Sequence, residues 1–211
     1  MSLLSPRAWL PALAAAAILC LASCSAAVLS AAAPASGGGN TSASPGANGA
    51  ASSGHGLKQV HDPRRVTGTI TGPCTYRDQG QLPDPRCTPG SIDPAVTQAN
   101  IHATICRSGY TKKVRPSASE TDRFKFDVAY PAYGDPEADK TELDHLVSLE
   151  LGGSNDATNL WPESPPTPNP KDKVEDALHA AVCDGRVTLA AAQNAIASDW
   201  LTAEKTLGIG S

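Results

Sequence analysis

Apolar residues in the last third of the chain recur with the spacing of one helix face. In NPKDKVEDALHAAVC, which starts at Asn169, they repeat at intervals that predict an amphipathic helix. Asn169 and Pro170 are typical of an N-cap and a first helical position, and Gly185 is typical of a helix end. A second apolar stripe over residues 189–201 predicts another helix, and the short link predicts an antiparallel pair.

Earlier segments show three weaker patterns. Asp93 with the proline after it predicts the start of a short helix that runs to about residue 104. The capping box that opens at Ser117 predicts a helix that ends before Pro131. Alternating residues over 66–70 predict a short strand.

The N-terminal residues predict export. Residues 1–23 join a single basic residue, Arg7, to an apolar run that is too short to cross a bilayer, as in a signal peptide. Leu21-Ala22-Ser23-Cys24 fits a lipobox, so we expect a lipid on Cys24; the alternative is an ordinary signal peptide with an incidental cysteine. Residues 24–57 are almost uncharged Ala, Gly, Ser and Pro, which predicts a flexible linker. We therefore expect an exported protein, lipid-anchored on the outer face of the cell membrane or released in a secreted form.

Residues 58–211 then form the one expected domain. Few aromatic residues and many prolines indicate a loop-rich domain with a small core, which favours disulfide staples. Setting aside Cys20 and Cys24 leaves four cysteines with three possible pairings. We favour Cys74–Cys87 with Cys106–Cys183, because the first pair closes a local loop. A cysteine metal site is disfavoured, because the sequence has no C-x-x-C spacing.

The charge pattern argues against tight binding of long duplex DNA. The net charge is −4, whereas proteins that contact many phosphates usually carry a basic face. A local basic cluster runs from Arg107 to Arg115 and includes Tyr110. It could contact phosphates and stack on a base, or it could be an ordinary solvated segment.

The densest set of reactive side chains lies in ELDHLVSLELGGSNDATNLWP, residues 142–162. Asp144 and His145 are adjacent, and Asn159 follows after a pair of glycines. Asn169 then opens the predicted helix. A neutral imidazole is available at neutral pH to take a proton, and Asp and Asn oxygens suit Mg²⁺ or Mn²⁺ better than zinc.

This segment resembles the ββα-metal finger of HNH endonucleases, in an actinobacterial secreted or lipoprotein-type branch. That family has an Asp-His pair at the end of one strand, an Asn-Leu step in the next, and a metal-binding His or Asn near a helix start. Asp144-His145, Asn159-Leu160 and Asn169 match this pattern, with Asn in place of His at the third position. The resemblance implies a finger over about residues 142–183, a metal on Asp144 and Asn169, a water activated by His145, and Asn159 as the orienting residue.

Two lysines follow in the first turn of the same helix. Lys171 and Lys173 are placed to steady a phosphate, or they are ordinary surface lysines. We expect an α+β domain, stapled by disulfides, with an HNH-like finger and a C-terminal antiparallel helical pair, and we take it as a monomer.

The expected activity is metal-dependent hydrolysis of phosphodiester bonds in nucleic acid, DNA before RNA, by a membrane-tethered endonuclease. The alternative is a non-catalytic envelope lipoprotein that uses the HNH-like scaffold to bind a protein or a cell-wall component. A sugar hydrolase needs a carboxylate pair, and the spacing of Glu142, Glu150 and Glu163 gives that idea no special support.

Overall fold

The structure is a computed structural model that describes residues 56–135 and 139–210. The predicted signal peptide and Cys24 lie outside these residues. All described residues belong to one compact unit of the chain. Within them, no helix has both the length and the apolar character that a membrane crossing requires.

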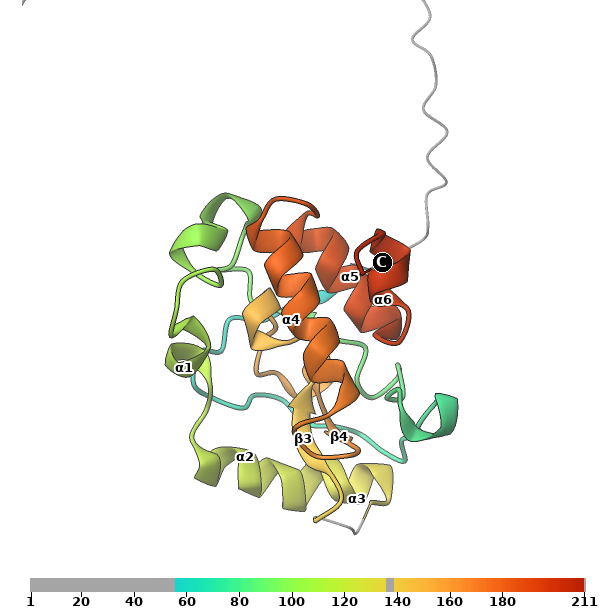
Figure 1. Ribbon diagram of the computed structural model, residues 1–211. Coiled ribbons are helices and arrows are strands. Elements are labelled where there is room, and N and C mark those ends of the chain that lie inside the picture. Colours follow the sequence, from blue (N-terminus) through green and yellow to red (C-terminus); the bar gives the residue numbers. More distant parts are fainter. Residues whose placement is uncertain (1–55, 136–138, 211) are drawn as a thin grey trace, which may run out of the picture. The chain divides into compact units, whose positions relative to one another are not determined.

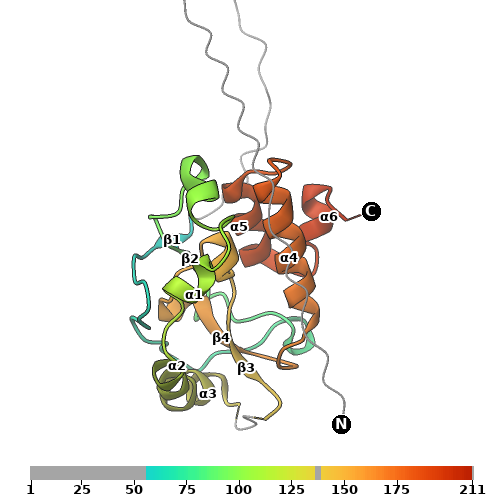
Figure 2. The same ribbon diagram turned by 60° about the vertical axis from the view of Figure 1, so that its left-hand side comes forward.

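An antiparallel hairpin lies at the centre of this unit. Strand β3 (Glu142–His145) pairs with β4 (Leu160–Glu163) so that His145 stands opposite Leu160. Helix α4 (Pro170–Cys183) follows directly, so the order strand–strand–helix agrees with the prediction. Figures 1 and 2 show the hairpin between two groups of helices, with α2 and α3 on one side and α4, α5 and α6 on the other.

The loop between the two strands turns at paired glycines. It contains the short helices η4 (Leu149–Leu151) and η5 (Ala157–Asn159). Gly152 has a φ of 74°, which favours glycine. A Cβ atom at Gly153 would lie 1.8 Å from the carbonyl oxygen of Val147, so only glycine allows the loop to close this tightly.

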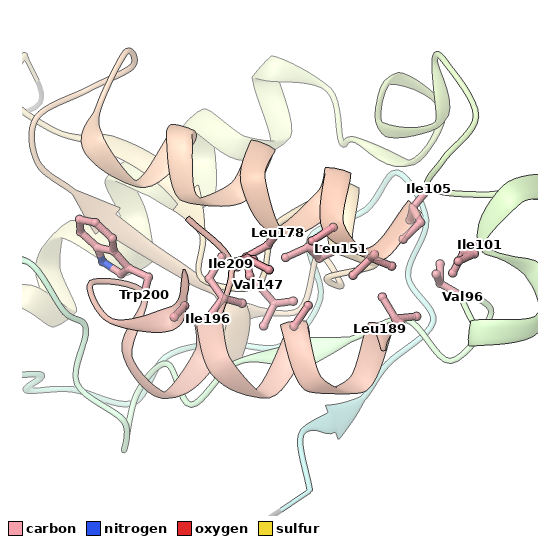
Figure 3. Packing of buried hydrophobic residues seen from close by; sticks show 14 of the residues in the cluster. Val96, Ile101, Ile105, Val147, Leu151, Leu178, Leu189, Ile196, Trp200 and Ile209 are labelled. Carbon is pink, nitrogen blue, oxygen red and sulfur yellow. The ribbon is translucent and has the colours of Figure 1, made fainter. Parts of the chain in front are cut away.

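The C-terminal helices build the larger core. Helix α5 (Leu189–Asp199) follows α4, as the apolar stripe predicts, and a further helix, α6 (Ala203–Leu207), completes the group. Figure 3 shows Leu178 of α4 and Ile196 of α5 meeting Val147 from the β3–β4 loop. A second core packs against the hairpin itself, around Trp161 and Leu146.

Both favoured disulfides are present. Cys74 is joined to Cys87, and Cys106 is joined to Cys183 at the end of α4. Disulfides persist in oxidising compartments, so they are consistent with an extracellular location.

The helices before the hairpin depart from the predictions in detail. Helix α1 (Tyr110–Val114) precedes α2 (Ala118–Phe124), the π-helical segment η3 (Lys125–Ala129) and α3 (Tyr130–Tyr133). Ser117 is the N-cap of α2 as predicted, but Glu120 accepts a bond from the Val66 backbone instead of closing a capping box. Pro131 does not end the helix, because it stands in the first turn of α3, where its missing N–H is tolerated.

Two other expectations near the N-terminal side were wrong. The helix expected from Asp93 is the 3₁₀ segment η2 (Gln98–Ala103), because Asp93 uses its carboxylate to cap the Ala95 N–H and Thr97 is the actual N-cap. The strand expected over residues 66–70 is replaced by an isolated bridge between Thr67 and Asp156. The remaining elements are a short parallel pair, β1 (Lys58–Gln59) and β2 (Ser91–Ile92), and η1 (Asp78–Gly80).

Candidate active site

His145 ends β3 and is buried, with 4% of its surface exposed. Its Nε2 lies 2.9 Å from Oδ1 of Asn155. The amide nitrogen of Asn155 donates to the backbone oxygens of Asp62 and Val114, both at 3.0 Å, so the amide orientation is determined. Because an amide oxygen can only accept, Nε2 of His145 carries the hydrogen, and Nδ1 keeps its lone pair.

The imidazole is neutral at neutral pH. Burial lowers the pKa of His145 to about 4, although the negative charge of Asp144 opposes this effect. A neutral imidazole with one nitrogen held by an acceptor is the form that a general base needs.

His145 and Arg115 line two adjoining pockets. The first, about 260 Å³, is also lined by Lys125, Leu143 and Leu160. The second is smaller and is lined by three carboxylates, those of Asp144, Glu150 and Glu175. Arg115 is exposed, and its guanidinium makes no hydrogen bond or ion pair with the described residues. The site therefore combines a neutral base with an available cation.

Lys171 does not lie on the surface, where a phosphate could reach it. It is 1% exposed, and its Nζ donates to Oδ2 of Asp144 at 2.6 Å and to the backbone oxygen of His145 at 2.9 Å. It also donates to the carboxylate of Glu175, one helical turn away. The suggested phosphate contact of Lys171 was therefore wrong, because three acceptors already hold its ammonium in the interior. Lys173 is exposed, and its contact with phosphate stays a prediction.

Burial and the neighbouring charges together set the ionisation of the carboxylates around Lys171. Burial opposes ionisation of Asp144, but the charge of Lys171 and the hydrogen bonds from Glu163 and Lys171 together lower the pKa of Asp144. Burial, followed by the negative charge of Asp144, raises the pKa of Glu163 to about 10, so Glu163 holds its proton at neutral pH. The result is an internal ion pair beside the imidazole.

Asn169 is the N-cap of α4. Its amide oxygen accepts from the N–H groups of Lys171 at 2.8 Å and Asp172 at 3.1 Å. Its amide nitrogen donates to Glu142 at 2.9 Å. The amide oxygen of Asn169 therefore bonds to the N–H groups of the helix, whereas the carboxylate of Asp144 bonds to Lys171. The two predicted metal ligands thus have different partners.

Asn159 supports the loop and not the imidazole. Its fully buried amide accepts from the Val147 N–H at 2.9 Å and donates to the backbone oxygens of Val147 and Ser154. Its own backbone oxygen accepts from Leu146 at 2.8 Å. The orienting contact with His145 comes from Asn155 instead. No sequence pattern indicates this role of Asn155, which is one of several polar residues after the glycine turn.

The two predicted metal ligands have other partners in this arrangement. Asp144 is paired with Lys171, and Asn169 caps a helix. Among the described residues, the His, Cys, Asp and Glu side chains that gather closely enough to hold a metal are Cys106, His179 and Cys183, with ligand atoms within 4.8 Å. Their two sulfurs form a disulfide and lack the thiolate charge that a metal needs. The divalent metal therefore stays a prediction.

Comparison of the chain with family models, with curated proteins and with solved structures finds no match. The geometry of the site carries the functional argument by itself.

Proposed function

We propose that the protein is a nuclease of the HNH type that hydrolyses phosphodiester bonds in nucleic acid outside the cytoplasm. In this proposal, β3, β4 and α4 form the ββα finger, and His145 is its base. The observation that carries the proposal is the hydrogen bond from Nε2 of His145 to Asn155. It leaves Nδ1 with a lone pair, and His145 lines a pocket together with Arg115, an available cation.

The reaction needs a proton acceptor and a cation. Nδ1 of His145 takes a proton from a water molecule as the water oxygen bonds to phosphorus. The bond from phosphorus to the leaving oxygen breaks, and that oxygen keeps the electron pair and takes up a proton from solvent water. Negative charge grows on the phosphoryl oxygens in the transition state, and Arg115 is placed to stabilise it through charged hydrogen bonds. Proton transfer by a positioned base contributes about 10²–10⁴-fold in rate.

Asn155 would fix the position of the His145 imidazole relative to the segment that carries Arg115. The same amide that accepts from His145 donates to the oxygen of Val114, the residue before Arg115. Movement of the arginine segment relative to the imidazole would break one of these bonds. No step here passes through a metal, because the predicted ligands have other partners; binding of Mg²⁺ or Mn²⁺, the lipid on Cys24 and the membrane anchor remain predictions.

Cleavage of labelled oligonucleotides and of supercoiled plasmid tests the proposal. The full chain is assayed with Mg²⁺, with Mn²⁺ and with EDTA, beside His145→Ala and Arg115→Ala. His102→Ala is the matched control, because that histidine is exposed and lines neither pocket. We expect His145→Ala to lose about 100-fold or more in rate while circular dichroism is unchanged. Absence of cleavage by the wild-type chain under all of these conditions would refute the nuclease proposal and support the alternative, a non-catalytic binding module.

A further inference from the structure

Phe126 is an unusual surface residue for this chain. Its side chain is 51% exposed, and in the described part of the chain only Leu201 is another large apolar residue with comparable exposure. Phe126 lies in the π-helical segment η3, and such segments are frequent at functional sites. Its ring meets that of Tyr130 edge-on, with centroids 5.6 Å apart.

An open pocket lies against this ring. It is lined by Phe126, Tyr130, Pro131, Gly134 and Asp135. Its walls are thus largely apolar, with one carboxylate at the side. The hydroxyl of Tyr76 donates to that carboxylate at 3.1 Å, which holds Asp135 in place.

Lys125 connects this aromatic pocket to the pocket of His145. Its Nζ lies 5.8 Å from the centroid of the Phe126 ring and 5.2 Å from that of Tyr130. It also donates to the backbone oxygen of Thr141 at 3.0 Å, so its position is determined. Because Lys125 lines the His145 pocket as well, one cation stands between the aromatic surface and the imidazole.

We propose that the aromatic pocket binds an unpaired nucleobase of the strand that is cut at His145, with the base stacked on Phe126 and a neighbouring phosphate beside Lys125. This inference rests on the proposed function and names its substrate class, a single strand or an unpaired segment. Every base can stack on an aromatic side chain, because each base has a π-face.

The placement of charged side chains favours a base over a phosphate in this pocket. The charged side chain that lines the aromatic pocket is the carboxylate of Asp135, which accepts from the Tyr76 hydroxyl. An amino group of a base edge is a donor that suits the same carboxylate, whereas a phosphate is not. The cations that suit phosphates, Arg115 and Lys125, line the pocket of His145, together with one carboxylate, Asp122. A net charge of −4 also agrees better with a few phosphate contacts on a short strand than with a long duplex.

Oligonucleotide binding in a His145→Ala background tests the inference without cleavage. Fluorescence anisotropy gives Kd for a labelled single strand, as DNA and as RNA, and for a duplex of equal length. Phe126→Ala should weaken binding of the single strand by about fivefold to a hundredfold, the usual effect of losing one stacked base. Phe126→Trp should preserve it, and duplex binding should change little.

Leu201→Ala is the matched control for loss of an exposed apolar side chain. Equal effects of Phe126→Ala and Leu201→Ala on the Kd of the single strand would overturn the inference. If wild-type protein cleaves and Phe126→Ala binds the single strand normally, the aromatic pocket does not bind a base, and the nuclease proposal stands. If Phe126→Ala weakens binding but wild-type protein cleaves nothing, the base-binding role of the aromatic pocket stands and the nuclease proposal fails. No binding of any strand would refute both.

Discussion

The amide oxygen of Asn155 accepts a hydrogen bond from Nε2 of His145 at 2.9 Å, inside the core of the domain. Asn155 is 2% exposed, and its amide nitrogen is bonded to two backbone oxygens from distant parts of the chain. It therefore determines both the tautomer and the orientation of the proposed base.

Asn155→Asp should move the acidic limb of the pH–rate profile to higher pH. Burial lowers the pKa of His145 to about 4, and a base works only when it is neutral. A carboxylate at position 155 would favour the protonated imidazole and raise this pKa, so activity would be lost at a higher pH as the pH falls. Rates measured from pH 4 to pH 8 give the profile. Asn194→Asp, at an exposed position of α5, should leave the profile unchanged; a shift in both variants would contradict the role of Asn155.

The buried histidine should also make stability depend on pH. Its pKa in the folded state, about 4, lies below the value of about 6.5 expected when unfolded. The unfolded chain therefore binds the proton more readily between these values, and stability falls as pH falls through this window. From pH 7 to pH 5, the loss due to His145 is about 2 kcal/mol.

Urea unfolding of wild type and His145→Gln at both pH values isolates this contribution. The buried carboxylates are present in both proteins, so their contribution to the pH dependence cancels in the difference. The variant should lose less stability than wild type on acidification. An identical loss in the two proteins would show that the imidazole is not desolvated as the structure has it.

Removal of the buried ammonium of Lys171 should lower the free energy of unfolding. Lys171→Met leaves Asp144 and Glu175 without their cation in the interior, and breaking a buried ion pair in this way typically costs about 3–5 kcal/mol. Lys173→Met, two residues further on and exposed, should stay within about 0.5 kcal/mol of wild type. The double variant Lys171→Met/Asp144→Asn should regain part of the loss. Urea unfolding measures all three, and equal stabilities of the two single variants would place Lys171 on the surface.

Two substitutions of Asn169 distinguish its role as a helix cap from a role as a metal ligand. Asn169→Ser retains an N-cap oxygen, whereas Asn169→Ala loses it at a cost of about 1 kcal/mol. Because the amide oxygen bonds to the helix N–H groups, we expect the serine variant to match wild type in stability and in the response of its activity to Mn²⁺. Loss of that response in the serine variant alone, at normal stability, would restore Asn169 as a ligand.

Local patterns along the chain were enough to predict the helix that Asn169 caps and the turn at the paired glycines, whereas the position of His145 at the end of a strand came from the resemblance to the HNH finger. The helix and the turn each depend on residues close in sequence: an N-cap is satisfied within its own first turn, and a glycine turn needs only its own backbone freedom. The disulfide between Cys74 and Cys87 was favoured because it closes a short loop.

Only the tertiary structure decided which groups surround the imidazole. The bonds of Asn155 to Asp62 and Val114 span 93 and 41 residues, and no spacing rule reaches that far. The burial of Lys171 depends on β3 lying against the first turn of α4, which turns an apparent surface lysine into an internal cation. A polar side chain takes its role from the partners that packing brings to it, and those partners come from the whole fold.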